Sequence, residues 1–182
     1  LANLEFYAQI IKNLYGKTVQ IKSSEYSKSF LLTCYLMPLV HILNKLGLGQ
    51  KSTIRRVPQK LFASSDKDVA AFLAGFYDAE GNDKGKPRIF SANKELIKDM
   101  QMLLLRLGID AHLYGRLRKV RLPQGRIINH QMYYLAIIRG SDQERLRKLV
   151  PTRKTFQIYE KAVDDRIPVG PILDDLRNIA LA

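Results

Sequence analysis

The chain has 182 residues, with 30 Lys and Arg against 17 Asp and Glu, a formal charge of +13 and an isoelectric point near 9.9. That length suits one compact domain or two small equivalent halves, and 46% hydrophobic residues are enough to fill a core, which argues against global disorder. No run of about 18 apolar residues occurs, so no membrane-embedded protein is expected. The charge predicts a polyanionic partner, and the clustering of bases in strand-like segments favours nucleic acid over a membrane surface.

Cys34 is the only cysteine, which excludes a disulfide scaffold and a cysteine-based zinc cluster. Its apolar neighbours predict a buried small hydrophobic residue. No signal peptide is visible, so we expect an intracellular, cytoplasmic protein, with an organellar location left open. The first residue is Leu1 rather than Met, which leaves room for further residues upstream.

In the first part of the chain, hydrophobic periodicity predicts a helix, a hairpin and a second helix that stops at Gly47. Their expected ranges are 4–15, then 17–22 paired with 30–35, then 38–46. A basic connector follows. A third helix is expected from Ser65 to Gly81, because Ser65 and Asp68 form a capping-box pattern and Gly81 stands where a C-terminal cap belongs.

The second part predicts a strand, a long helix, two strands and further helices. The expected ranges are a strand at 88–91, a helix at 93–107, strands at 111–122 and 126–139 around a turn at 123–125, a helix at 141–150, a helix at 153–163, and a loop with a short terminal helix. Ser141 and Glu144 form another capping-box pattern.

An internal repeat relates the two parts. Residues 43–46 resemble residues 146–149, and the same register aligns Lys51 with Lys154. Both parts run helix, strand, strand, helix, but the second alone has the 65–81 helix and the strand after it. The missing element either lies upstream of Leu1 or is supplied by a second chain.

The 65–81 helix carries a ridge of small residues opposite its apolar stripe. They are Ala71, Ala74, Gly75, Asp78 and Ala79. Glycine inside a helix costs about 1 kcal/mol relative to alanine, and close approach of another helix is one reason to tolerate it. The alternative is a glycine tolerated by chance.

The same helix ends in Asp78 and Glu80, which face the negative end of the helix dipole at a cost of about 0.3–1 kcal/mol when exposed. A divalent cation beside the helix end would reverse that penalty, and Mg²⁺ prefers one or two carboxylates together with phosphate oxygens. Taken alone, a solvated acidic helix end is the favoured interpretation.

Residues 73–81, LAGFYDAEG, closely resemble the nonapeptide that names the LAGLIDADG homing endonucleases. Glu80 replaces the second Asp of that nonapeptide. The expected element order also fits over residues 51–163, and the repeat extends the resemblance towards the start. The resemblance implies an α+β fold with antiparallel saddle-shaped sheets and motif helices at the interface of two half-domains. We expect a partial first half with linker at 1–58, the motif half at 59–165 and a tail at 166–182.

By the same resemblance, the chain is expected to be a sequence-specific homing DNA endonuclease that cuts both strands of a duplex with Mg²⁺ or another divalent cation such as Mn²⁺. Glu80 is then the metal-binding acid, and Asp78 caps the partner helix or supports the interface. Gly75 is the packing residue, flanked by Ala71 and Ala79. A second motif helix would come from an upstream segment or from a homodimer partner, and the gene would be intron-encoded or intein-associated.

Three further residues are expected near the cut. Asn93 stands where the family keeps a solvent-organising residue, with an ordinary helix N-cap as an equal alternative. Lys154 and its repeat counterpart Lys51 fit a basic residue near the scissile phosphate, with average surface lysines as the alternative. Some relatives carry an arginine where this chain has Ile97, so that role does not transfer.

The basic strands are the expected DNA contacts. Between His112 and Arg126 the chain has five bases and no acid, which are Arg116, Arg118, Lys119, Arg121 and Arg126. Alternation places Arg116 and Arg118 on one face, able to reach base edges or phosphates. Lys17, Gln20 and Lys22 offer the same in the first copy, and a solvated strand face is the alternative for all of them. His41, His112 and His130 have no metal-ligand spacing.

Two other functions use the same scaffold and stay open. One is an intron RNA maturase, and the other is a DNA-binding protein that has lost catalysis.

Overall fold

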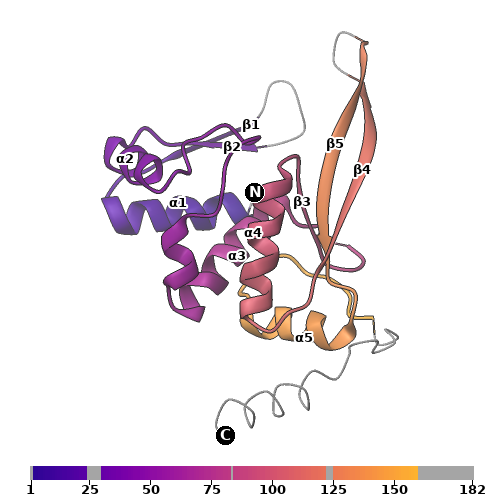
Figure 1. The fold of residues 1–182 in the computed structure, drawn as a ribbon. Helices are drawn as coiled ribbons and strands as arrows, with labels where there is room; N and C mark the ends of the chain where they lie inside the picture. Colours follow the sequence, from indigo (N-terminus) through magenta and orange to yellow (C-terminus); the bar gives the residue numbers. More distant parts are fainter. Residues whose placement is uncertain (1, 24–29, 83, 122–124, 160–182) are drawn as a thin grey trace, which may run out of the picture.

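The computed structural model describes residues 2–23, 30–82, 84–121 and 125–159. In chain order the first elements are α1 (Ala2–Tyr15), β1 (Gln20–Ser23), β2 (Phe30–Thr33) and α2 (Met37–Lys45). A short 3-10 helix, η1 (Gln59–Ala63), leads to α3 (Asp66–Glu80), β3 (Arg88–Ser91) and α4 (Lys94–Arg106). β4 (His112–Arg121), β5 (Ile127–Ala136) and α5 (Gly140–Leu149) follow (Figure 1).

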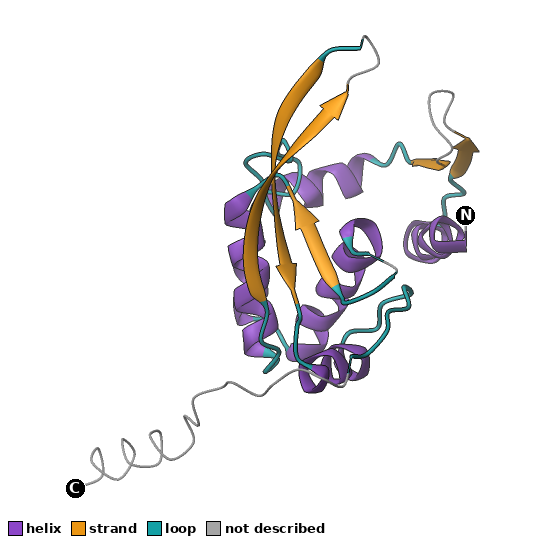
Figure 2. Ribbon diagram, turned by 90° about the vertical axis from the view of Figure 1, so that its right-hand side faces the viewer, coloured by secondary structure: helices purple, strands orange, loops and turns teal. Residues whose placement is uncertain are grey.

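The larger sheet is antiparallel, with strand order β3-β5-β4. β4 and β5 form a long hairpin that rises well beyond the helices (Figures 1 and 2). Near its base, Ile89, Leu113 and Leu135 share the face that packs on α3 and α4, because the register pairs both Ile89 and Leu113 with Leu135. The opposite face carries the residues that alternate with these.

The core of the molecule lies between this sheet and the helices. Its fully buried members from α4 and the strands include Ile97, Met100, Leu103, Leu104, Ile89 and Leu135. α4 supplies most of them because its leucines and methionine recur at helical spacing. This packing fixes α3 against β3 and so fixes the end of α3 relative to the sheet.

α3 begins and ends where the sequence predicts. The Ser65 side chain accepts a hydrogen bond from the Asp68 backbone nitrogen at 3.2 Å, which satisfies one free N–H of the first turn. Gly81 is the predicted C-cap of α3. Its φ is −79°, so it does not adopt the left-handed conformation in which glycine often ends a helix. A Cβ there would lie 2.5 Å from the Tyr77 carbonyl oxygen and 2.8 Å from its ring, so close packing requires the glycine.

The first part of the chain forms the predicted helix, hairpin and helix. β1 and β2 pair antiparallel, from Gln20 opposite Thr33 to Ser23 opposite Phe30, and α1 contacts both strands. α2 has no buried residue. Among the described residues of the chain, no helix is long and apolar enough to cross a membrane.

Two sequence expectations in the last part of the chain differ from the structure. The predicted helix at 153–163 is wrong over its described part, because residues 151–159 run without helix. The 141–150 helix begins at Gly140 with Arg139 as its N-cap, so Ser141 lies within the first turn and not at the predicted cap position. In the 123–125 turn only Gly125 is described, with φ +82°; residues 122–124 and the predicted terminal helix lie outside the described residues.

Candidate functional site

Glu80 is the last residue of α3 and is exposed to solvent. The buried residues Leu73, Ala74 and Tyr77 anchor the preceding turns in the core. Glu80 makes no hydrogen bond or ion pair with any other described residue. A rigid helix therefore presents a free carboxylate at its C-terminal end.

Residues 151–159, the C-terminal strap, run past this helix end, where Thr152 and Lys154 bind Asp78 and Gly81. The Lys154 ammonium donates a hydrogen bond to the Gly81 carbonyl, one residue beyond Glu80. Phe156 packs edge-on against Tyr77, with ring centroids 6.0 Å apart. The structure thus brings Lys154 to the end of the motif helix, where the resemblance places a basic residue.

Asp78 joins three segments of the chain. Its carboxylate accepts hydrogen bonds from the Thr152 hydroxyl at 2.5 Å and the Arg153 backbone nitrogen at 2.8 Å, both in the strap. On its other side it accepts one from the Tyr7 hydroxyl of α1 at 3.3 Å. Burial, followed by the neighbouring Asp78 carboxylate, raises the pKa of Tyr7 above its ordinary value. Asp78 therefore supports the site and is 9% exposed.

The small-residue ridge of α3 is partly open, since Ala74 and Asp78 are buried and Gly75 is half-buried. Ala71 and Ala79 are exposed, and a Cβ at Gly75 would meet only the Tyr7 hydroxyl, at 3.9 Å. A cavity of about 270 Å³ lies between α1 and α3, lined by residues that include Tyr7, Gly75 and Asp78. A second, of about 450 Å³, shares Ala71 and Pro151 with it. No described helix packs tightly on Gly75.

Asn93 is the N-cap of α4. Its side-chain oxygen accepts from the backbone nitrogens of Glu95 and Leu96, and its amide donates to the carbonyls of Ser52 and Arg55. The Asn93 side chain is buried and all its donors and acceptors are used, so the N-cap alternative is confirmed. No donor or acceptor of this side chain is left to bind solvent.

Lys51 is exposed in the connector, next to the Ser52 carbonyl that Asn93 binds. No hydrogen bond or ion pair among the described residues links Lys51 to Glu80 or Lys154. Ile97, where some relatives carry an arginine, is fully buried in the core.

The open face of the larger sheet carries two of the predicted basic residues. The register pairs Arg116 with Met132 and Arg118 with His130, on the face opposite the core residue Leu113. Lys119 pairs with Asn129 on the other face, so the five bases do not form one surface. Arg126 is exposed at the start of β5, and Arg121 closes the β4 register opposite Ile127.

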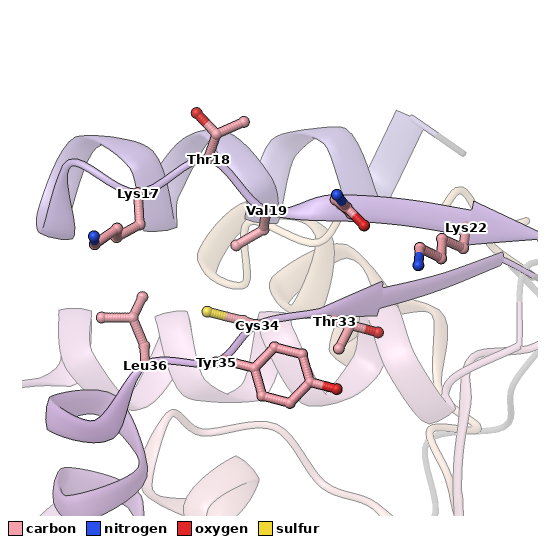
Figure 3. Close-up of a pocket in the computed structure, with 9 residues that line it drawn as sticks. Lys17, Thr18, Val19, Lys22, Thr33, Cys34, Tyr35 and Leu36 are labelled. Atoms are coloured by element: carbon pink, nitrogen blue, oxygen red, sulfur yellow. The ribbon is translucent and has the colours of Figure 1, made fainter.

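The three DNA-binding residues predicted in the first part line one cavity. Lys17, Gln20 and Lys22 line a hollow of about 450 Å³ together with the segment from Thr33 to Leu36. Figure 3 shows Lys17 and Lys22 on one side of it, and Cys34 and Tyr35 on the other. Cys34 is half-buried here, so the prediction of full burial is wrong. Lys17 and Lys22 line this hollow, where their ammonium groups could contact an anion.

The described residues contain no group of three or more histidine, cysteine or acidic side chains that could hold a metal ion. His112 lies 3.5 Å from Asp110, His130 is on the open sheet face and His41 is exposed on α2. Mg²⁺ is often bound by one or two protein carboxylates, with phosphate oxygens as further ligands. Glu80 could supply one such carboxylate. A second acid would have to come from outside the described residues.

Sequence reasoning missed the residues that hold the site together. Tyr7 and Thr152 are distant from Asp78 in the chain, at separations of 71 and 74 residues, so no local pattern could mark them. Arg88 on β3 was also missed, because a single basic residue in a short strand does not by itself indicate a binding site.

Comparisons with known proteins give one matching family and several similar folds. Residues 67–151 match the family described as LAGLIDADG-like domain. A solved structure of mesophilic variants of the homing endonuclease I-DmoI superimposes with a TM-score of 0.56 at 18% identity, covering 81% of this chain and 71% of that one. I-DmoI in complex with its target DNA and Mg gives a TM-score of 0.51 at 19% identity, over 78% and 68% of the two chains.

The curated relatives are much longer proteins. The chain is 32% identical over 80% of its length to 12% of a probable translation initiation factor of Thermococcus kodakarensis. It is 27% identical over 67% of its length to 12% of a ribonucleoside-diphosphate reductase alpha subunit of Bacillus subtilis. A replication factor C small subunit of Methanocaldococcus jannaschii matches at 32% identity over 58% of this chain and 5% of that protein.

The matched segment contains the motif helix that ends at Glu80, the larger sheet and α5, and Lys154 follows it in the strap. The α+β fold is that of the homing endonuclease I-DmoI. Residues 67–151 of the chain thus form a LAGLIDADG-like domain.

Proposed function

We propose that the chain is the catalytic part of a sequence-specific DNA endonuclease of the homing type, which hydrolyses phosphodiester bonds with a divalent cation. One observation carries the proposal. The exposed Glu80 carboxylate ends a buried motif helix, and the Lys154 ammonium binds the carbonyl of the next residue.

Glu80 is the residue that would hold Mg²⁺ or Mn²⁺ here. When bound, such a cation supplies charge neutralisation at the phosphate and activation of water. Lys154 adds a fixed positive charge beside the same helix end, where it stabilises the charge that builds on the phosphate oxygens. Asp78 does not share this role, because its oxygens are occupied by Thr152, Arg153 and Tyr7.

A second acidic helix end must complete the site, since one motif supplies one carboxylate. The open ridge around Gly75 supports a partner helix, because small side chains let two helix backbones approach closely. We propose that this helix comes from another segment of the same protein or from a second copy of the chain. Ala71 and Ala79 would lie in that interface.

The sheet would hold the duplex. A two-stranded ribbon fits the DNA major groove, and the β4–β5 hairpin is such a ribbon with Arg116 and Arg118 on its open face. The cavity lined by Lys17, Gln20 and Lys22 offers two further cations and a neutral amide in the first part of the chain. Most of these bases would position the DNA through its phosphates.

The curated matches support a mobile genetic origin. The matched segments occupy 5–12% of proteins whose names place them in translation, nucleotide reduction and DNA replication. Because these proteins have unrelated activities, the segment they share does not perform any one of those activities. We infer that the chain is encoded within a host gene, as an intein or intron product, and acts where its DNA lies, in the cytoplasm or an organelle.

Glu80→Gln tests the proposal. A target is first selected from a random duplex library, and cleavage of that target is then measured with Mg²⁺. The variant is expected to lose cleavage while binding the duplex normally in metal-free buffer, because only the metal-binding charge is removed. Glu144→Gln, an exposed acid on α5, is the matched control and should cleave like the wild type.

Cleavage that survives in Glu80→Gln would contradict the metal-binding role. Binding without cleavage by the wild type, in a sample that contains both motif helices, would favour a DNA-binding protein without catalysis. Preferential binding of intron RNA over duplex DNA would favour the maturase.

A further inference from the structure

Arg88 lies in the strand that follows the candidate metal-binding helix end. Gly81, the residue after Glu80, forms a β-bridge with Ile89. The Asn82 backbone nitrogen donates to the Arg88 carbonyl at 3.1 Å, and the Arg88 backbone nitrogen donates to the Asn82 side chain at 2.6 Å. These bonds tie the position of Arg88 to the end of α3.

The Arg88 side chain lies on the open face of the sheet over an aromatic cluster. The register places Arg88 and Phe90 on the face of Tyr134, opposite the core residue Ile89. The guanidinium carbon is 5.6 Å from the Tyr134 ring centroid. Tyr134 in turn stacks on Tyr114, with centroids 5.2 Å apart and planes 22° apart, and Phe90 packs at 5.7 Å.

This cluster restrains the guanidinium and leaves its donors free. An arginine that lies over an aromatic ring is attracted to the ring face, while its N–H groups point outward in the guanidinium plane. The exposed Arg88 side chain makes no hydrogen bond or ion pair with the other described residues. Arg116 and Arg118, further along the hairpin, lie over no aromatic ring of the described part of the chain.

A restrained, planar set of donors fits a base edge better than a phosphate. Guanine presents N7 and O6 in the major groove, and an arginine fork binds both at once. A phosphate contact needs only a positive charge, which a mobile lysine supplies equally well. Fixing the fork in advance lowers the entropy lost on binding.

We propose that Arg88, held by Tyr134, determines specificity by recognising a guanine in the base pairs next to the cut. This inference rests on the proposed function, and the adjacency of Arg88 to Glu80 sets the position of the base along the duplex.

The test is selection of bound duplexes from a random library, without metal, for the wild type, Arg88→Lys, Arg88→Ala and Tyr134→Leu. The wild type should select a guanine at one position near the cut. Arg88→Lys should reduce that preference by about 5- to 150-fold, the discrimination that one bidentate contact supplies, with the salt dependence unchanged. Arg88→Ala should lose the preference, because no donor remains at this position to bind N7 and O6 of the guanine.

Tyr134→Leu should weaken the same preference and no other, because the charge remains and only its restraint is lost. Lys60→Ala, an exposed base on η1, is the charge-matched control for Arg88→Ala, and its selected sequences should equal those of the wild type. Circular dichroism melting checks that each variant folds.

An Arg88→Lys profile that matches the wild type overturns the inference, as does a uniform loss of affinity across all sequences, which would indicate a phosphate contact. In both cases the proposed endonuclease stands if the wild type still cleaves its selected target. A wild type that binds no duplex overturns both proposals.

Discussion

The two parts of the chain share an order of elements but not a core. In both, a helix is followed by two antiparallel strands and a second helix. In the second part, α4 buries Met100, Leu103 and Leu104 completely. In the described residues before 51, Leu36 is the single buried hydrophobic residue, and α2 buries none.

The difference lies in what covers the sheet. In the second part, α3 and β3 pack against α4 and β5, and together they enclose the core. The described first part has no counterpart of α3 or β3, so Met37 and Leu31 are left 77% and 61% exposed. A helix–strand–strand–helix order therefore buries little until a motif helix and its strand are added.

Truncating a hydrophobic side chain should lower the free energy of unfolding much more in the second part than in the first. Leu103→Ala is expected to lower the free energy of unfolding by about 2–5 kcal/mol, because it empties a fully enclosed site. Leu43→Ala, on α2 and 36% exposed, should cost less than about 1 kcal/mol. Urea unfolding measures both, and equal losses would contradict the contrast between the parts.

Asp78→Asn tests the connection between the parts. The change exchanges an acceptor-only carboxylate for an amide that cannot accept from all three of its donors. We expect a loss of about 1–3 kcal/mol in unfolding free energy and faster amide exchange in α1, which Tyr7 attaches to Asp78.

Asp66→Asn, on the same helix and paired with Arg106 at the surface, is the matched control and should cost less than about 1 kcal/mol. Unchanged exchange in α1 would show that Tyr7 does not hold it.

Gly75→Ala should give the smallest change in stability and the opposite sign. The new methyl group meets only the Tyr7 hydroxyl at 3.9 Å, so the unfolding free energy should rise by about 0.5–1 kcal/mol. Cleavage should fall, because the methyl group obstructs a second motif helix. Gly81→Ala is the contrasting variant, since its Cβ would overlap Tyr77, and it should be destabilising. Full cleavage by Gly75→Ala would argue against a helix docked on this ridge.

The local pattern predicted α3 well. Ser65 caps its start, Gly81 ends it, and the nonapeptide places Glu80 at its last residue. Pattern failed in the strap, where the sequence predicted a helix. There Thr152, Arg153 and Lys154 bind Asp78 and Gly81 instead, and these contacts replace the hydrogen bonds that a helix would make with itself. Such partners lie more than 70 residues away in the chain, beyond any window of periodicity.

Local sequence patterns were enough to predict the elements up to α5, the motif helix with its terminal acid and the basic hairpin, because helical spacing, capping and alternation act over a few residues. Packing between distant segments makes Asn93 a fully hydrogen-bonded N-cap, brings α1 and the strap to Asp78, and places Arg88 over Tyr134. Those outcomes depend on which distant groups packing brings within hydrogen-bonding or van der Waals range, and that is a property of the folded chain alone.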